Sequence, residues 1–386
     1  MYYWRLSGFY FFYFAALGAL IPYWGLYLRS LGFGGVAIGE LVAIIMATKI
    51  VAPNVWGWIA DRSGRRMRLV RLACLLATLS FAGVFLGQGY WLLALVTALF
   101  SFFWNAALPQ FEATTLNHLG SEVQRYSSIR LWGSIGFIVA VTGLGEVFDR
   151  LGTALLPQVL LLLFAGIWFA SLAVPESSAP RRAHDHEPLR RVLRRPAVVS
   201  LLLVCFLIQA SHGPYYTFYS LYLSAHDYSE SAIGQLWALG VVAEIGVFLK
   251  MHRWLPRHGA RRLLLVATGL TTVRWVLIAL FVEQLWILVL AQALHAASFG
   301  VYHAVAIHLV HRLFTGRHQG RGQALYSSLS FGAGGAVGSL GAGYLWDGPG
   351  ASVMYLVAAA VAAVAGIIAW LGIREEGGST PAGAAL

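Results

Sequence analysis

The stretch GELVAIIMATKIVAPNVWGW, Gly39 to Trp58, has the length and the apolar character of a helix that crosses a membrane. Lys49 lies near its middle, so the nearer end of the helix is about ten residues away, or about 15 Å. A lysine side chain reaches only roughly 6 Å and cannot carry its ammonium group to water along the lipid face. The stretch therefore predicts a membrane protein in which Lys49 faces other protein or a water-filled cavity.

Apolar runs of similar length recur along nearly the whole chain. Of its 386 residues, 59% are hydrophobic and 11% are charged, and the mean hydropathy is +0.69. The runs are apolar on all sides, which favours helices over the alternating strands of a membrane barrel. We predict an all-α integral membrane protein with twelve transmembrane helices, at residues 6–29, 36–59, 68–87, 90–116, 127–148, 154–174, 197–224, 231–251, 262–282, 285–310, 322–345 and 350–372.

The formal charge of +11 indicates the topology of the chain. Basic residues follow spans two, six, eight and ten, whereas the opposite loops carry little positive excess. By the positive-inside rule, both termini lie in the cytoplasm, and we expect the bacterial inner membrane as the location. A nucleic-acid partner is not needed to explain the charge. The basic residues after these spans are Arg62, Arg65, Arg66, Arg68, Arg71, Arg181, Arg182, Arg190, Arg191, Arg194, Arg195, Lys250, Arg253, Arg257, Arg261, Arg262, Arg312, Arg317 and Arg321.

The chain contains one six-span unit twice. LYLRSLGFGGVAIGELVAI (26–44) aligns without a gap with LYLSAHDYSESAIGQLWAL (221–239), and GEVFDRLG (145–152) resembles GYLWDGPG (343–350). Units with an even number of spans share one orientation, so the repeat is parallel. We predict an N-terminal bundle at 1–174, a cytoplasmic linker at 175–196, a C-terminal bundle at 197–374 and a short tail at 375–386. Two such bundles can rock about a central cavity.

GWIADRSGRR (57–66) resembles the signature of the major facilitator superfamily, G-x-x-x-D-R-x-G-R-R, and the resemblance covers the whole chain. In that family this loop latches the two halves on the cytoplasmic side. The resemblance therefore implies a gating role for Asp61, Arg62 and Arg65. The second copy, HRWLPRHGARR (252–262), has Pro256 where the first has Asp61, which implies an asymmetric gate.

Further charged side chains lie at membrane depth, where each costs several kcal/mol unless it is paired. The repeat alignment pairs Lys49 with Glu244, and opposite charges at matched positions indicate a cavity between the halves. We interpret Lys49 as a site or coupling residue, and a structural ion pair between spans is the alternative. We expect two ion pairs, Glu112 with Arg130 and Glu244 with Arg274. The other polar residues noted in these spans are Asn105, His295, His303 and His308.

These residues carry a second resemblance. Glu112 and Arg130 resemble the sugar-binding pair of the lactose permease branch, and Glu244 and Arg274 with a histidine of span ten resemble its proton-handling cluster. Span ten departs from that pattern, because no carboxylate follows its histidines. The overall length, IPYWGLYL (21–28) and RLWGSIGF (130–137) look more like the phenylpropionate permease group.

The buried charges favour an anionic substrate. Three cations, Lys49, Arg130 and Arg274, stand against Glu112 and Glu244, which leaves one cation to hold a carboxylate. Aromatic rings suit a phenyl group or a sugar face equally. The candidate substrate-binding residues are Lys49, Asn105, Glu112, Arg130, Trp24, Tyr27, Tyr216 and Tyr219.

Proton coupling requires a group whose protonation alternates with access. Burial favours the neutral form of a carboxyl group, whereas an adjacent arginine favours the ionised form. The candidates are Glu112, Glu244, Arg274 and His303. No glycine-rich nucleotide loop is present, so we expect no cofactor and the proton gradient as the driving force. Cys74 and Cys205 are too few for a metal site, and no constellation typical of an enzyme appears.

Together these patterns predict a proton symporter for a small organic acid, with an aromatic acid as one candidate. A proton-coupled sugar or nucleoside symporter is the alternative, and a multidrug/proton antiporter comes third. The expected partners are the substrate, the proton and the lipid bilayer, with no obligatory protein partner.

Overall fold

A computed structural model describes residues 2–176, 189–315 and 318–373, which are helical almost throughout and include no strand. The N-terminal half contains α1 (Tyr3–Ser30), α2 (Gly35–Ser63), α3 (Arg66–Phe81), η1 (Ala82–Leu86), α4 (Tyr90–Leu119), η2 (Val123–Arg125), α5 (Tyr126–Leu151), η3 (Thr153–Leu155) and α6 (Leu156–Leu172). The C-terminal half contains α7 (Leu189–Leu193), α8 (Pro196–Ser224), α9 (Glu230–His258), α10 (Ala260–Leu280), α11 (Leu285–Ala293), η4 (Ala296–Val301), α12 (Tyr302–Leu313), α13 (His318–Ser327), η5 (Ser328–Gly334), α14 (Gly335–Asp347) and α15 (Ala351–Gly372).

The prediction of an all-α membrane protein with two six-helix bundles is confirmed. Eleven helical runs of the described chain are long and apolar enough to cross a membrane. The predicted eleventh span corresponds to the run α13, η5 and α14, whose many glycines make it less apolar than the others. The largest difference from a predicted end is in α9, which continues to residue 258 instead of 251. Its last turns are basic and amphipathic, so hydropathy marks where the apolar run stops but not where the helix stops.

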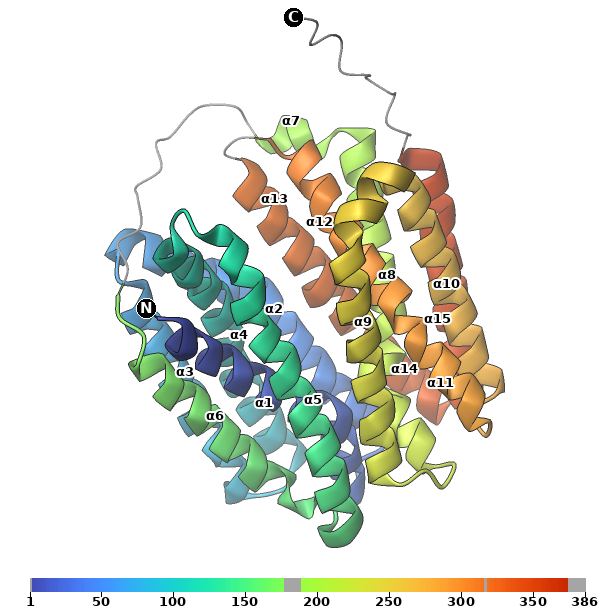
Figure 1. Cartoon of the computed structure of the whole chain (residues 1–386). Helices are drawn as coiled ribbons and strands as arrows, with labels where there is room; N and C mark the ends of the chain where they lie inside the picture. The colour runs from blue at the N-terminus through green and yellow to red at the C-terminus, as the bar shows by residue number, and fades with distance from the viewer. Residues whose placement is uncertain (1, 177–188, 316–317, 374–386) are drawn as a thin grey trace, which may run out of the picture.

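The two halves lie side by side, and the C-terminal half is drawn from yellow-green to red in Figure 1. The connections α2–α3 and α9–α10 and the short helix α7 lie at one end, which we call the basic end after its arginines (Figure 1). The predicted linker 175–196 holds α7, but its residues 177–188, with Arg181 and Arg182, lie outside the described residues. Arg317 and the predicted tail 375–386 also lie outside them.

Glycines allow the helices to approach closely both within and between the halves. Within the N-terminal half, a Cβ atom on Gly136 of α5 would overlap the carbonyl oxygen of Phe11 in α1. Between the halves, a Cβ atom on Gly39 of α2 would lie 2.7 Å from the carbonyl oxygen of Ser339 in α14. Small residues at such crossings are the usual means of helix association in membranes. They fix how near the two bundles come to each other.

Gly136→Ala is expected to destabilise the N-terminal half, because the added methyl group meets the backbone of α1 and not a movable side chain. Overpacking of this kind costs about 1 to 3 kcal/mol. The matched control is Gly143→Ala in the same helix, where nothing lies within 4 Å of the new Cβ atom. Thermal unfolding of the purified proteins in detergent measures the difference, and equal melting temperatures for the two variants would contradict this packing.

Candidate functional site

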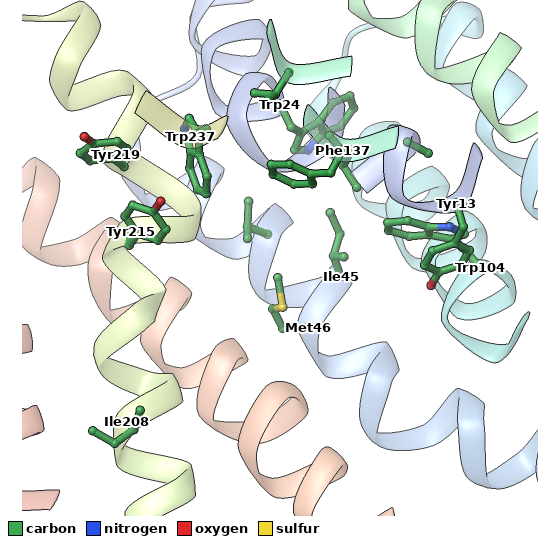
Figure 2. Close-up of a cluster of buried hydrophobic side chains, with 14 of the residues drawn as sticks. Tyr13, Trp24, Ile45, Met46, Trp104, Phe137, Ile208, Tyr215, Tyr219 and Trp237 are labelled. Carbon is green, nitrogen blue, oxygen red and sulfur yellow. The ribbon is translucent and has the colours of Figure 1, made fainter. Parts of the chain in front are cut away.

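A cavity of about 220 Å³ lies between the two halves and is lined by both. Most of its wall is apolar and aromatic. In Figure 2, Phe137, Ile45 and Met46 lie on the side of the N-terminal half, opposite Tyr215 and Trp237. The lining residues include Phe14, Leu17, Met46, Arg130, Phe137, Gln209, Tyr215, Tyr216, Trp237, Glu244, His295, Phe299 and Phe331.

Arg130 is the cation of this lining and comes from α5. Its guanidinium carbon lies 3.8 Å from the centre of the Phe14 ring and 5.8 Å from that of Tyr10, close enough for cation–π attraction. The predicted ion pair with Glu112 is not formed, although the two charges interact electrostatically. Glu112 instead accepts a hydrogen bond from the Tyr126 hydroxyl at 3.4 Å. Arg130 thus meets the cavity without a carboxylate in direct contact.

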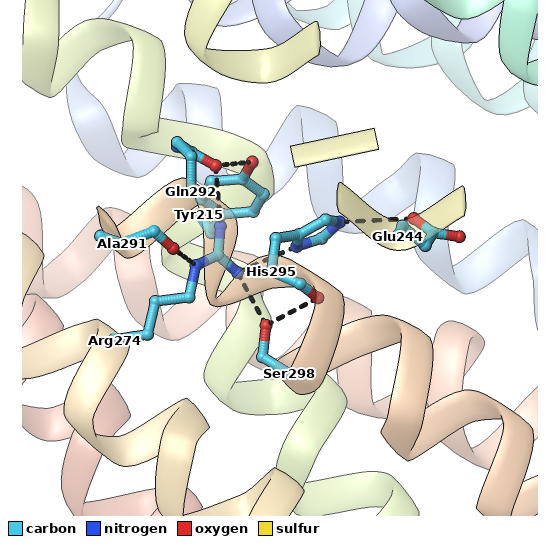
Figure 3. Close-up of polar contacts among 7 residues, drawn as sticks. All are labelled: Tyr215, Glu244, Arg274, Ala291, Gln292, His295 and Ser298. Atoms are coloured by element: carbon cyan, nitrogen blue, oxygen red, sulfur yellow. Dashed lines mark hydrogen bonds and ion pairs between the residues drawn. The ribbon is translucent and has the colours of Figure 1, made fainter. Parts of the chain in front are cut away.

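Glu244 and Arg274 do not pair directly either, because His295 lies between them (Figure 3). The Nε2 atom of His295 is 3.7 Å from Glu244 Oε2, and its Nδ1 atom is 3.0 Å from Arg274 Nη1. An arginine can only donate, so Nδ1 must accept and the ring proton of neutral His295 is assigned to Nε2. That proton points toward Glu244. At 3.7 Å the contact is electrostatic and too long for a hydrogen bond.

Arg274 is fully buried in the C-terminal half and does not line the cavity. Its Nε atom donates to the Ala291 carbonyl at 2.9 Å, Nη1 to Ser298 Oγ at 3.0 Å, and Nη2 to Gln292 Oε1 at 3.2 Å. Its guanidinium carbon also lies 4.2 Å from the centre of the Tyr215 ring. These contacts hold Arg274 in place beside His295, and its predicted part in proton coupling stays a prediction.

Sequence reasoning noted His295 but gave it no role. The available signal was the spacing of His295, since Gln292, His295 and Ser298 recur every three residues in the first part of the span. The sequence also did not reveal that spans ten and eleven contain π-helical turns, η4 and η5. Such turns are rare and often lie at functional sites. Here they carry Phe299 and Phe331 of the cavity wall.

Gln209 is a further lining residue that the sequence did not single out. It lies in α8, and its side chain is 1% exposed. Its amide nitrogen, Nε2, has no hydrogen-bond partner among the described residues. A buried donor without a partner beside a cavity is suited to a ligand, because leaving it unsatisfied costs about 1 to 3 kcal/mol.

Two predicted substrate-binding residues lie just behind the wall. Lys49 does not line the cavity; its Nζ atom is 3.4 Å from Sδ of Met46, which does. Asn105 donates to the Ile45 carbonyl at 3.0 Å and to Thr48 Oγ1 at 2.9 Å, so it ties α4 to α2.

Of the four aromatic residues predicted to bind substrate, one lines the cavity and three do not. Tyr216 lines the cavity, whereas Tyr219 packs edge-on against Trp237 with the ring centres 5.8 Å apart. Trp24 and Tyr27 pack against each other, with ring centres 5.4 Å apart, outside the lining.

His303 also lies outside the lining. Its Nδ1 atom is 2.8 Å from the Tyr326 hydroxyl, and its ring stacks on Phe299 with the centres 5.6 Å apart. It is therefore separated from the cavity by one ring.

The residues of the signature loop make contacts within the N-terminal half. Asp61 pairs with Arg66 at 2.6 Å, and the guanidinium carbon of Arg62 lies 3.9 Å from the Trp58 ring centre. Arg65 is exposed at the start of α3. The contacts described for Asp61 and Arg62 are local, and the gating role of the three residues stays a prediction.

Comparisons with known proteins agree with this architecture. Residues 3–357 match the model of the MFS_1 like family. The chain is 31% identical to a probable 3-phenylpropionic acid transporter of Escherichia coli K12, over 90% of this chain and 92% of that protein. It is 28% identical to a maltose permease of Geobacillus stearothermophilus, over 88% and 86% of the two chains.

Among solved structures, a point mutant of the nucleoside transporter NupG superposes with a TM-score of 0.86, over 97% of this chain and all of that one. At 16% sequence identity, this superposition shows that the two chains share a fold. The chain therefore belongs to the MFS_1 like family and is a secondary transporter of the major facilitator superfamily type.

Proposed function

We propose that this protein is a proton-coupled symporter for a small organic acid with an aromatic body, located in the bacterial inner membrane with both termini in the cytoplasm. One observation carries the proposal. Arg130 and Glu244, from different halves, line one cavity whose wall is otherwise mostly aromatic and aliphatic. The name of the Escherichia coli relative, a probable 3-phenylpropionic acid transporter, supports the same substrate class.

Proton and substrate binding are coupled through the charge of the cavity. When Glu244 is ionised, its negative charge balances that of Arg130, with which it interacts electrostatically, and opposes the entry of a carboxylate. When Glu244 is protonated, the charge of Arg130 is unmatched and attracts the carboxylate. Each ligand therefore raises the affinity for the other. The Nε2 proton of His295, aimed by Arg274, stabilises Glu244 when it is ionised.

The apolar part of the substrate occupies the rest of the cavity. The rings of Phe14, Phe137 and Tyr216 suit an aromatic body, and Gln209 Nε2 offers a hydrogen-bond donor. Lys49 adds a positive field from behind Met46. We assign Asn105 and Tyr219 to the support of the wall, and Trp24 and Tyr27 to packing around it.

A proton-coupled sugar or nucleoside symporter is the second candidate, because the maltose permease relative and the NupG fold agree with it. A neutral ligand, however, leaves Arg130 unmatched once Glu244 is protonated. A multidrug antiporter comes third, because Arg130 in the lining would repel a cationic drug.

Proteoliposomes given an acidic exterior are expected to accumulate 3-phenylpropionate, because an inward proton gradient drives a symporter. The uptake of radiolabelled 3-phenylpropionate, maltose and uridine is compared with and without an ionophore that collapses the gradient. Ionophore-sensitive uptake of the acid alone, above the passive uptake of the neutral acid by protein-free liposomes, supports the proposal. Accumulation of maltose or uridine without the acid would reject it.

Arg130→Gln is expected to weaken acid binding by about 10- to 100-fold, the range for loss of a hydrogen bond to a charged group. The matched control is Arg150→Gln, near the exposed end of the same helix. Titration of the purified proteins with 3-phenylpropionate measures both affinities. If Arg130→Gln bound the acid as tightly as Arg150→Gln, the assignment of Arg130 would be wrong.

Glu244→Gln is expected to abolish accumulation driven by the proton gradient and to keep exchange of the acid across the membrane, because glutamine imitates the protonated carboxyl group. Counterflow with the same acid on both sides measures exchange without a gradient. Glu283→Gln, at an exposed loop, serves as the control. Gradient-driven accumulation that survives in Glu244→Gln would show that another group carries the proton.

A further inference from the structure

The two copies of the repeat end a helix with an aspartate at the same place. GEVFDRLG (145–152) and GYLWDGPG (343–350) align Asp149 with Asp347. Asp149 lies in the last turn of α5, and Asp347 is the last residue of α14. Both lie at the end of the molecule opposite the basic end, which we call the far end.

Each aspartate accepts two backbone hydrogen bonds from the first residues of a helix in the other half. Oδ1 and Oδ2 of Asp347 accept from the amides of Gly35 and Val36 in α2, both at 2.9 Å. Oδ1 and Oδ2 of Asp149 accept from the amides of Glu230 and Ser231 in α9, at 2.6 and 3.1 Å. The first amides of a helix have no partner inside it and carry partial positive charge, so a carboxylate satisfies both needs.

The backbones meet tightly at the same two places. A Cβ atom on Gly343 would lie 2.7 Å from the Gly35 carbonyl oxygen, and one on Gly145 would lie 2.7 Å from the Glu230 carbonyl oxygen. Tyr23 strengthens the second contact by donating to the carbonyls of Val141 at 2.7 Å and Glu230 at 3.4 Å. Apart from the bond between Tyr23 and Val141, which lies within the N-terminal half, the donors and acceptors of these bonds belong to different halves. They must therefore separate when the bundles part at this end.

We propose that Asp149 and Asp347 form a paired latch that holds the far end of the transporter closed. Each carboxylate clamps the start of a helix in the opposite bundle, and both clamps must open before the cavity can be reached from that side. The latch is independent of the substrate that the cavity binds and rests only on alternating access between the two halves.

The test measures access to the cavity from the far end. A cysteine replaces the lining residue Leu17, and a membrane-impermeant maleimide is added to vesicles of known orientation. A second protein with Glu283→Cys, in the α10–α11 connection, marks the vesicles whose exposed face is the far end. Native Cys74 and Cys205 are buried, and the protein without the added cysteine gives their background labelling.

Asp149→Ala and Asp347→Ala are each expected to speed labelling of the Leu17→Cys reporter from the far end by about 2- to 30-fold, the range for loss of a helix-capping side chain. The double variant should multiply the two factors, because the clamps lie at separate helix pairs. Asp149→Asn, which keeps one acceptor oxygen, should lie between the alanine variant and the parent. Asp227→Asn, an exposed acid in the α8–α9 connection, should label at the parent rate.

Labelling from the basic end provides the second measurement. If the latch is real, labelling from the basic end does not become faster when labelling from the far end does. Unchanged far-end labelling in the double alanine variant would overturn the proposal. An equal rise from both ends, which is the signature of a loosened or unfolded protein, would also overturn it, as would an equal rise in Asp227→Asn.

Discussion

An ionised side chain at membrane depth needs polar partners or water, and this constraint organises both halves of the protein. Arg274 meets it completely within the C-terminal half, through a carbonyl, a hydroxyl, an amide oxygen and an imidazole. Among the described residues of the N-terminal half, Arg130 meets the aromatic faces of Phe14 and Tyr10 and the field of Glu112, with no ion pair or hydrogen bond. Its remaining solvation has to come from the cavity or from a ligand within it. The difference between the two arginines is the reason for proposing that Arg130 binds the substrate and that Arg274 orients His295.

The same constraint fits a proposed proton site and a proposed anion site on opposite walls of the cavity. Glu244 belongs to the C-terminal half and Arg130 to the N-terminal half, so each changes its surroundings when the bundles rock. A charge pair split between moving bodies gives a transporter a way to sense whether both ligands are present. Close glycine crossings between α2 and α14 keep the bundles near enough for the two charges to act on the same cavity.

Much of the fold followed from the sequence, because hydropathy, basic loops and the repeat all report on properties that each residue carries by itself. The predicted spans agree with the helices apart from ends such as that of α9. The charge argument likewise brought Arg130 and Glu244 to one cavity, although it paired them with the wrong partners. Pairing depends on how each helix is rotated about its axis, and the apolar runs are too uniform to fix that rotation. The neighbour of Glu244 proved to be His295, directly before the π-helical turn η4, and not Arg274.

The central claim is that substrate and proton bind together because Glu244 and Arg130 share one cavity. Calorimetric titration with 3-phenylpropionate at neutral pH, in two buffers of different ionisation enthalpy, counts the protons taken up on binding. We expect net uptake of up to one proton per bound acid in the parent protein and about none in Glu244→Gln, since only the fraction of Glu244 that is ionised before binding has a proton to gain. Tight binding of the acid by the parent protein with no proton uptake would contradict the account.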